Sequence, residues 1–186
     1  MANAQCPEPG VNQAEYGTDA WNGYLYDGVN TFDAANFEGT LDQASLVFDE
    51  QFTAGTTDGG CAYTPETFSV RFKNRQTLSC GLHTFTIGSD DGVRFSIDGG
   101  STYLIDIPSG TGYATSVVDV HLTGGDYELV LEYYHNTGAN RVSVAHSEVL
   151  GDFEGEIAGD QTICNDPVDP VEFTSVSSAT FCSQLA

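Results

Sequence analysis

Apolar and polar residues alternate with a period of two along much of the chain. Six segments carry this pattern: 67–74, 83–88, 93–99, 116–122, 126–134 and 141–147. Successive side chains of an extended strand point to opposite faces, so the alternation predicts strands with one buried face. The residues predicted to face the core are Phe68, Val70, Phe72, Phe85, Ile87, Val93, Phe95, Ile97, Val118, Val120, Leu122, Tyr127, Leu129, Leu131, Tyr133, Val142 and Val144.

The segments between these strands are rich in residues that favour turns. They include TTDGG, IDGG, LTGG and HNTGAN, and glycine and asparagine tolerate the backbone angles that tight turns require. An apolar repeat of 3.6 residues never continues for three helical turns, and the nearest, at 36–48, is interrupted by Gly39. Short antiparallel strands joined by turns are typical of a β-sandwich or a β-barrel. The sequence therefore predicts an all-β fold.

The charge of the chain is strongly unbalanced. Its 186 residues include 27 acidic and 5 basic side chains, a formal net charge of −22, while 40% of the residues are apolar. That apolar fraction is ordinary for a folded domain. The negative field disfavours nucleic acid and anionic membrane surfaces as partners, and no apolar stretch is long enough for membrane insertion. The acidity indicates either salty or calcium-bearing surroundings or simple solubility.

Five cysteines, Cys6, Cys61, Cys80, Cys164 and Cys182, occur without CxxC spacing. Zinc binding is therefore disfavoured and disulfides are favoured, which points to a location outside the cytosol. We predict the pairs Cys61–Cys80 and Cys164–Cys182, with Cys6 left over. The start of the chain lacks the basic and apolar regions of a signal peptide. We therefore expect a mature piece or a fragment of a secreted protein.

The sequence lacks the common motifs of catalysis. It contains no G-x-S-x-G nucleophile elbow and no glycine-rich phosphate loop. The four histidines, at 83, 121, 135 and 146, lie on or beside predicted strands without paired spacing, so they indicate ordinary packing rather than a metal site. Adjacent acids in one turn cannot supply the separated acid and nucleophile of a glycosidase. We predict that this chain is not an enzyme.

Two neighbouring carboxylates, Asp90 and Asp91, interrupt the strand pattern in the segment TIGSDDGVRFSIDGG. Asp91–Gly92 between two alternating runs is a strong signal for a two-residue β-hairpin turn. The alternative is a calcium site, because calcium binds several carboxylate and carbonyl oxygens. Consecutive side chains of an extended chain point in opposite directions. Both acids could bind one ion only with an unusual peptide geometry.

The same region resembles a known family. GLHTFTIGSDDGVRFSIDGG, LTGGDYELVLEYYHNTGANRVSVAH and the earlier WNGYLYDG are similar to PA-fourteen (PA14) domains, which are named after the N-terminal fragment of anthrax protective antigen. The resemblance covers about Glu15 to Glu148, and its specific parts are the Asp-Asp-Gly segment and LEYY. It implies an antiparallel β-sandwich of the lectin-like PA14 type.

The resemblance also implies a metal site. In fungal flocculins and bacterial adhesins of this family, two aspartates joined by a cis peptide hold a calcium ion that binds vicinal sugar hydroxyls. By this resemblance Asp90 and Asp91 would be the carboxylate ligands of Ca²⁺. The loop after LEYY would supply the side chain of Asn136 and main-chain carbonyls near Gly138 and Asn140. These residues would hold the ion and, through it, the ligand.

Two features of this loop depart from the family pattern. His135 stands next to the loop ligands, and the loop contains no aromatic residue that could stack against a sugar. We expect Tyr113 and the segment IPSGTGYATS to form the walls that contact a bound ligand.

The resemblance and a change in composition divide the chain into three parts. Residues 1–14 form an N-terminal segment and residues 15–150 form the PA14-type domain. Residues 151–186 are acidic and proline-bearing, and GEIAGDQTIC is similar to the start of a repeated adhesin module, so we expect a linker and a second, truncated module. The other interpretations of this tail are a loose terminus, a last strand of the main domain, or a strand donated to a neighbour.

These observations favour a calcium-dependent carbohydrate-binding module of a secreted or cell-surface adhesin. Its expected partners are glycans on cells or surface polysaccharides and the neighbouring modules of a larger adhesin. One alternative is a structural spacer or self-assembly module of a surface protein without sugar binding. Another is an accessory domain of a glycosidase or protease.

Overall fold

The computed structural model describes residues 10–53, 55–63, 66–110 and 112–150, and within these ranges the chain forms strands and no helix. No helix that could cross a membrane is therefore found in this part of the chain. The strands are β1 (Gly17–Thr18), β2 (Asn22–Asp27), β3 (Phe37–Thr40), β4 (Phe48–Glu50), β5 (Gly55–Thr56), β6 (Ala62–Tyr63), β7 (Phe68–Asp90), β8 (Gly92–Ser96), β9 (Ile105–Ile107), β10 (Ala114–His135) and β11 (Arg141–Leu150).

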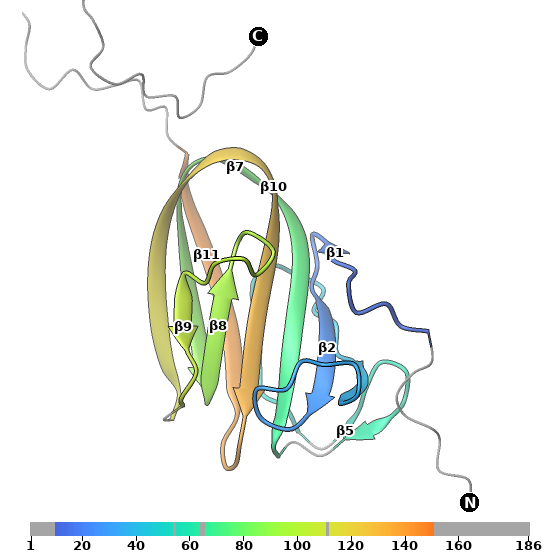
Figure 1. Ribbon diagram of the computed structural model, residues 1–186. Helices are drawn as coiled ribbons and strands as arrows, with labels where there is room; N and C mark the ends of the chain where they lie inside the picture. Colours follow the sequence, from blue (N-terminus) through green and yellow to red (C-terminus); the bar gives the residue numbers. More distant parts are fainter. Residues whose placement is uncertain (1–9, 54, 64–65, 111, 151–186) are drawn as a thin grey trace, which may run out of the picture.

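The longest strands of the fold are β7 and β10 (Figure 1). They pair antiparallel from Ala114 opposite Ser89 to His135 opposite Phe68. Figure 1 shows this ribbon folded over at one end, so each strand contributes one half to each of two layers. At the fold, Gly124 and Gly125 adopt φ angles of +78° and +130°, which residues with a Cβ rarely adopt. The LTGG segment predicted as a turn therefore lies inside a continuous strand.

The first layer has the strand order β3-β2-β7-β10-β8-β9. In the second layer, the C-terminal half of β7 lies between the N-terminal half of β10 and β11, and β11 also pairs with β4. Apart from the short parallel pairing of β1 with β7, these pairings are antiparallel. The predicted all-β, antiparallel sandwich is confirmed.

The core lies between the layers and follows the predicted alternation. The buried members of the predicted set are Phe68, Val70, Phe72, Phe85, Ile87, Val93, Phe95, Leu122, Leu129, Leu131, Tyr133, Val142 and Val144. Ile97, Val118, Val120 and Tyr127 are half-buried against them. Trp21, which no alternating segment contains, is fully buried, and its indole Nε1 donates a hydrogen bond to the carbonyl of Leu46 at 3.0 Å.

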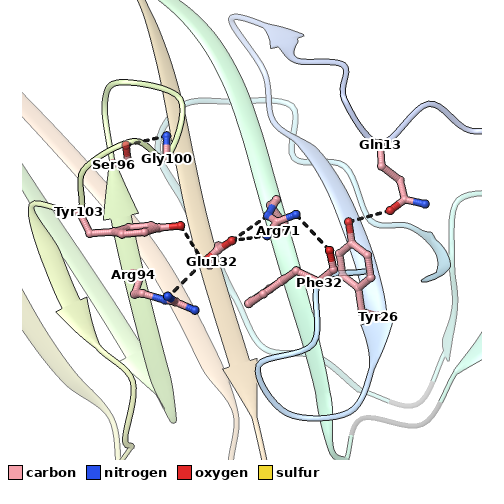
Figure 2. Close-up of polar contacts among 9 residues, drawn as sticks. All are labelled: Gln13, Tyr26, Phe32, Arg71, Arg94, Ser96, Gly100, Tyr103 and Glu132. Carbon is pink, nitrogen blue, oxygen red and sulfur yellow. Dashed lines mark hydrogen bonds and ion pairs between the residues drawn. The ribbon is translucent and has the colours of Figure 1, made fainter. Parts of the chain in front are cut away.

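The outer face of the first layer carries a polar network around Glu132 (Figure 2). Glu132 is only 4% exposed and accepts hydrogen bonds from Arg71 Nε at 2.8 Å and from Tyr103 Oη at 3.0 Å. Arg94 Nε lies 3.3 Å from the other side of the carboxylate. Arg71 also stacks over the ring of Phe32 at 4.7 Å. The network ties the segments that carry Phe32 and Tyr103 to the sheet.

The passage from β7 to β8 is a crossing between layers. Only Asp91 separates the two strands, yet β8 pairs with β10 and β9, and no pairing with β7 occurs within the described ranges. The predicted hairpin turn at Asp91–Gly92 is therefore wrong. After the half of β7 that lies in the second layer, the chain enters the first layer. There β8 pairs with the side of β10 that faces away from β7.

Some sequence-based expectations fall outside the described residues. These include Cys6, Cys164, Cys182 and the tail 151–186. Cys61 is buried in a turn beside Thr57, to whose Oγ1 its N–H donates. The cysteine pairs, the domain limits and the second module stay predictions.

Candidate functional site

Two of the described segments cross between the layers at one end of the sandwich. The chain passes from β7 to β8 through Asp91 and from β10 to β11 through 136–140. Residues 108–110 follow β9, and residues 112–113 precede β10. β8 begins opposite Tyr134, near the end of β10, and β11 begins opposite Asp90, at the end of β7. The topology therefore brings all the predicted site residues to this end of the molecule.

Asp90 and Asp91 are joined by a cis peptide bond, so the peptide geometry expected from the family resemblance is confirmed. Asp90 is buried, at 9% exposed, and the side chain of Asp91 is 18% exposed. The backbone carbonyl of Asp90 accepts a hydrogen bond of 2.5 Å from Tyr133 Oη. Burial, followed by the charges of the two acids, raises the pKa of Tyr133. The phenol therefore stays protonated as a hydrogen-bond donor to Asp90.

The side chain of Asp91 holds the loop between β10 and β11. Its Oδ2 accepts a hydrogen bond of 2.7 Å from the backbone N–H of Asn136. On the other side of Asn136, its carbonyl accepts hydrogen bonds of 3.0 Å from the N–H and the Oγ1 of Thr67. The start of the loop is thus fixed on both sides, while the side chain of Asn136 is exposed.

His135 lies directly behind the acid pair. Its side chain is fully buried, and its ring packs 5.6 Å from the ring of Phe68. Its Nδ1 is 3.3 Å from Asp91 Oδ2, a close contact that lacks the geometry of a hydrogen bond. Neither ring nitrogen has a hydrogen-bond partner in the described part of the chain. The sequence pattern suggested ordinary packing for His135 and did not indicate this contact.

The other two predicted ligands in the loop are Asn140 and Gly138. Asn140 Oδ1 accepts a hydrogen bond of 2.7 Å from the N–H of Phe52, so the side-chain oxygen is already engaged. This leaves the main-chain carbonyl of Asn140 for the predicted ligand role. Gly138 has a φ angle of +100° and is glycine for this conformational reason, because a Cβ there would meet no atom within 4 Å.

Gly110, shortly after β9, packs tightly against Asp91. A Cβ built on Gly110 would lie 2.1 Å from the Cβ of Asp91, so only glycine fits at this position. Tyr134 Oη donates a hydrogen bond to the carbonyl of Pro108. These contacts place Pro108 and Gly110 next to the acid pair. The contact of this segment with a bound ligand stays a prediction.

Tyr113 lies beside the acids as part of a polar cluster. Its hydroxyl is 2.8 Å from Ser143 Oγ, and the guanidinium of Arg141 stacks over its ring at 4.2 Å. Arg141 donates to both carboxylate oxygens of Asp49, at 2.7 and 2.5 Å. These hydrogen bonds lower the pKa of Asp49. Arg141 is the cross-strand neighbour of Asp90, so the cluster borders the acid pair.

The available donors are of the type that calcium prefers. Carboxylate, amide and carbonyl oxygens are hard ligands that suit calcium, whereas zinc prefers His and Cys. Among the described residues, no group of three or more His, Cys, Asp or Glu side chains is arranged to hold a metal ion. A calcium site at Asp90 and Asp91 would therefore complete its shell with loop amide and carbonyl oxygens. The ion and its ligand set stay predictions.

A second cluster of titratable groups joins β7 and β11 away from the acids. His83 Nδ1 and His146 Nε2 share a hydrogen bond of 2.9 Å, and the two rings stack. Glu148 accepts a hydrogen bond of 2.6 Å from Ser79 Oγ and lies 3.9 Å from His83. The sequence did not reveal this pair because its members are 63 residues apart.

Arg141 and Asp49 were also missed by the sequence analysis. The one available signal was that Arg141, one of only five basic residues, directly follows the loop at 136–140. Asp49 lies 92 residues before Arg141, and only the pairing of β4 with β11 brings the two together.

The chain is similar in fold to several solved structures. No protein-family model matches it, and no curated protein does. Among solved structures, it is similar to the PA14 sugar-binding domain from an RTX adhesin, with a TM-score of 0.52 and 17% identity over 71% of this chain and 91% of that one. It is also similar to the PA14 domain of the MpAFP antifreeze protein, with a TM-score of 0.50 and 12% identity over 78% and 90% of the two chains.

A third similar structure is an anti-sigma factor domain-containing protein. It has a TM-score of 0.55 and 24% identity, over 72% of this chain and 43% of that one. The chain thus spans less than half the length of that protein. At these identities the similarity concerns the fold alone, and the fold is PA14-like.

Proposed function

We propose that this chain is a calcium-dependent carbohydrate-binding module of a secreted or cell-surface adhesin. The observation that carries the proposal is the attachment of Asp91 to the loop at 136–140 through the 2.7 Å hydrogen bond from Asn136. This contact keeps a carboxylate pair beside a loop that presents the exposed side chain of Asn136. A binding module of this kind acts without turnover.

The residues that would hold calcium are Asp90 and Asp91 through their carboxylates, Asn136 through its side-chain oxygen, and Gly138 and Asn140 through their main-chain carbonyls. Calcium takes about six to eight oxygen ligands, so hydroxyl oxygens of a sugar can complete its shell. The buried Tyr133 and His135 support the acids from the core side. The loop from Pro108 limits access from the β9 side.

Two further observations support a sugar ligand. One similar fold is described as a sugar-binding domain from an adhesin. The net charge of −22 disfavours anionic partners such as nucleic acid, whereas neutral glycans carry no charge to be repelled. The proposed partners are glycans on cells or surface polysaccharides, together with neighbouring modules of a larger adhesin.

A glycan array probed with and without a calcium chelator tests this function. Glycans bound in millimolar calcium should be lost with chelator and lost in the Asp91→Asn variant. The matched control is Asp106→Asn, since Asp106 is an exposed aspartate on β9. Equal binding with and without chelator would contradict the proposal.

A spacer or interaction module is the second candidate function. It is favoured by the similarity to an anti-sigma factor domain-containing protein, whose description names no sugar. In that case calcium would raise the unfolding temperature, and the protein would bind no glycan on the array. The same pair of measurements therefore distinguishes the two functions.

A further inference from the structure

Arg141 stands directly beside the acid pair on the second layer. It is the cross-strand neighbour of Asp90 in the pairing of β11 with β7. Directly opposed residues of neighbouring strands place their side chains on the same face, with Cβ atoms about 4.5–5.5 Å apart. The guanidinium of Arg141 therefore belongs to the same surface as the carboxylate of Asp90.

Tyr113 reaches the same surface from the other side of β7. Its hydroxyl contacts Ser143 on β11, and it does so by passing over Gly88. A Cβ built on Gly88 would lie 2.3 Å from Tyr113 Oη and 2.5 Å from Ser143 Oγ. The absence of a side chain two residues before Asp90 is thus what allows Tyr113 and Arg141 to stack beside it.

The cluster is open to solvent and stereochemically ordered. Tyr113 is 38% exposed, Arg141 36% and Asp49 52%. The ion pair uses Nε and Nη2 of Arg141, and leaves Nη1 out of both bonds. A bidentate guanidinium–carboxylate pair has a fixed geometry, so it presents one donor group and carboxylate lone pairs in a defined arrangement.

The charges of this surface are balanced. Arg141 is the one basic residue of the second layer in the described ranges. The other four basic residues belong to β7 and β8 in the first layer: Arg71, Lys73, Arg75 and Arg94. Asp49 cancels the charge of Arg141, and a bound calcium would cancel the charges of Asp90 and Asp91. This surface belongs to a chain of net charge −22, and its arginine is already paired with Asp49. It therefore disfavours a ligand that carries a negative charge.

We propose that Tyr113, Arg141 and Asp49 form the ligand-selecting subsite next to the acid pair, and that the subsite takes the hydroxyl groups of a neutral sugar. This inference rests on the proposed calcium-dependent sugar binding. A sugar hydroxyl both donates and accepts hydrogen bonds, which matches Arg141 Nη1 and the carboxylate of Asp49. The exposed part of the Tyr113 ring offers an apolar contact to the C–H groups of the sugar.

The test uses the full chain and two readouts, calcium binding alone by calorimetry and glycan binding on an array in millimolar calcium. Arg141→Gln should weaken binding of neutral glycans about tenfold, as expected for loss of a hydrogen bond to a charged group. Its calcium affinity should stay within about twofold of the wild type. Arg75→Gln is the matched control, because Arg75 also pairs with a carboxylate, Glu128, and lies over a tyrosine ring, Tyr16.

A second variant tests the charge balance and does not remove the arginine. Asp49→Asn leaves the positive charge of Arg141 uncompensated, so glycans that end in a carboxylate-bearing sugar should gain binding relative to neutral ones.

Tyr113→Phe removes only the hydroxyl that contacts Ser143, and provides a variant with minimal change if Arg141→Gln does not fold. Because the ring loses the Ser143 contact that fixes it beside Arg141, we expect Tyr113→Phe to weaken neutral glycan binding while calcium affinity is kept.

The outcomes separate this inference from the proposed function. If Asp91→Asn abolishes calcium and glycan binding while Arg141→Gln and Tyr113→Phe leave the glycan profile unchanged, the subsite is wrong and the proposed function stands. A wild-type preference for acidic glycans would overturn the neutral-sugar class. If the wild type binds calcium but no glycan, the proposed function fails, and the subsite fails with it.

Discussion

The carboxylate of Asp91 accepts a hydrogen bond of 2.7 Å from the backbone N–H of Asn136, 45 residues further along the chain. This single contact connects two crossings between the layers, the one from β7 to β8 and the one from β10 to β11. The candidate site depends on it, because Asp91 and Asn136 belong to different strand connections.

We predict that Asp91→Ala destabilises the protein by about 1–2 kcal/mol in calcium-free buffer, as expected for loss of a charge-assisted hydrogen bond. Asp91→Asn should lose less, because its amide oxygen can still accept from Asn136. Urea unfolding in the presence of a chelator measures the difference. Asp106→Ala, at an exposed position on β9, is the control. The structural role of the contact is contradicted if Asp91→Ala is as stable as this control.

Gly110 provides a steric test of the neighbouring wall. We predict that Gly110→Ala lowers the free energy of unfolding by about 1–3 kcal/mol, the usual range for overpacking, because its Cβ would lie 2.1 Å from Asp91 Cβ. Gly112→Ala is the matched control, since a Cβ there would meet no atom within 4 Å. Urea unfolding of the two variants gives the comparison. Equal stabilities would show that the segment does not pack on Asp91 as described.

The network around Glu132 makes a prediction about stability alone. Glu132→Gln should lower the free energy of unfolding by about 1–3 kcal/mol, because it weakens the hydrogen bonds from Arg71 and the ion pair with Arg94 at a buried carboxylate. Glu128→Gln is the control, because the Arg75–Glu128 pair is exposed and exposed pairs contribute about 0–1 kcal/mol. Chemical unfolding checks both. A smaller loss for Glu132→Gln than for Glu128→Gln would contradict this assignment.

The hydrogen-bonded pair His83 and His146 should make the free energy of unfolding depend on pH. Burial, followed by the charge of His83, lowers the pKa of His146 below 6.5. The unfolded chain therefore binds a proton at His146 more readily than the folded protein does. The contribution to stability is complete above about pH 6.5, and it decreases as pH falls through the lowered pKa of the folded state.

Unfolding in urea at pH 7.5 and pH 5.5 measures this effect. The wild type should lose more stability between these pH values than His146→Phe, which removes the titrating group and keeps an aromatic ring beside Phe85. Equal losses in the two proteins would contradict the assignment.

The sequence predicted the fold class well because its signals were local. Alternation identified the inward faces of the strands, including Phe72 and Leu131, which are fully buried. It could not show that the predicted strands 67–74 and 83–88 form the single strand β7, or that 116–122 and 126–134 form the single strand β10. These long strands depend on pairing between segments that are distant in the sequence. For the same reason, Asp91–Gly92 looked like a hairpin turn, although β8 pairs with β10.

The site was only partly accessible from the sequence. Asp90 and Asp91 were predicted as site residues because they are adjacent in an informative motif, and the loop at 136–140 was predicted through the family resemblance. Arg141 and Asp49 could not be connected, since no local pattern links residues 92 positions apart. His135 was read as ordinary packing because its contact with Asp91 depends on how two connections meet.

Calorimetric titration of the wild-type chain with calcium tests the central claim most directly. We predict one ion bound per chain with a dissociation constant of about 10⁻⁴–10⁻³ M, the range typical of extracellular calcium modules. Asp91→Asn should weaken this binding at least about tenfold, while Asp106→Asn leaves it unchanged. If the wild type shows no calcium binding at several times these concentrations, or if Asp91→Asn binds as tightly as the wild type, the acid pair is not a calcium site.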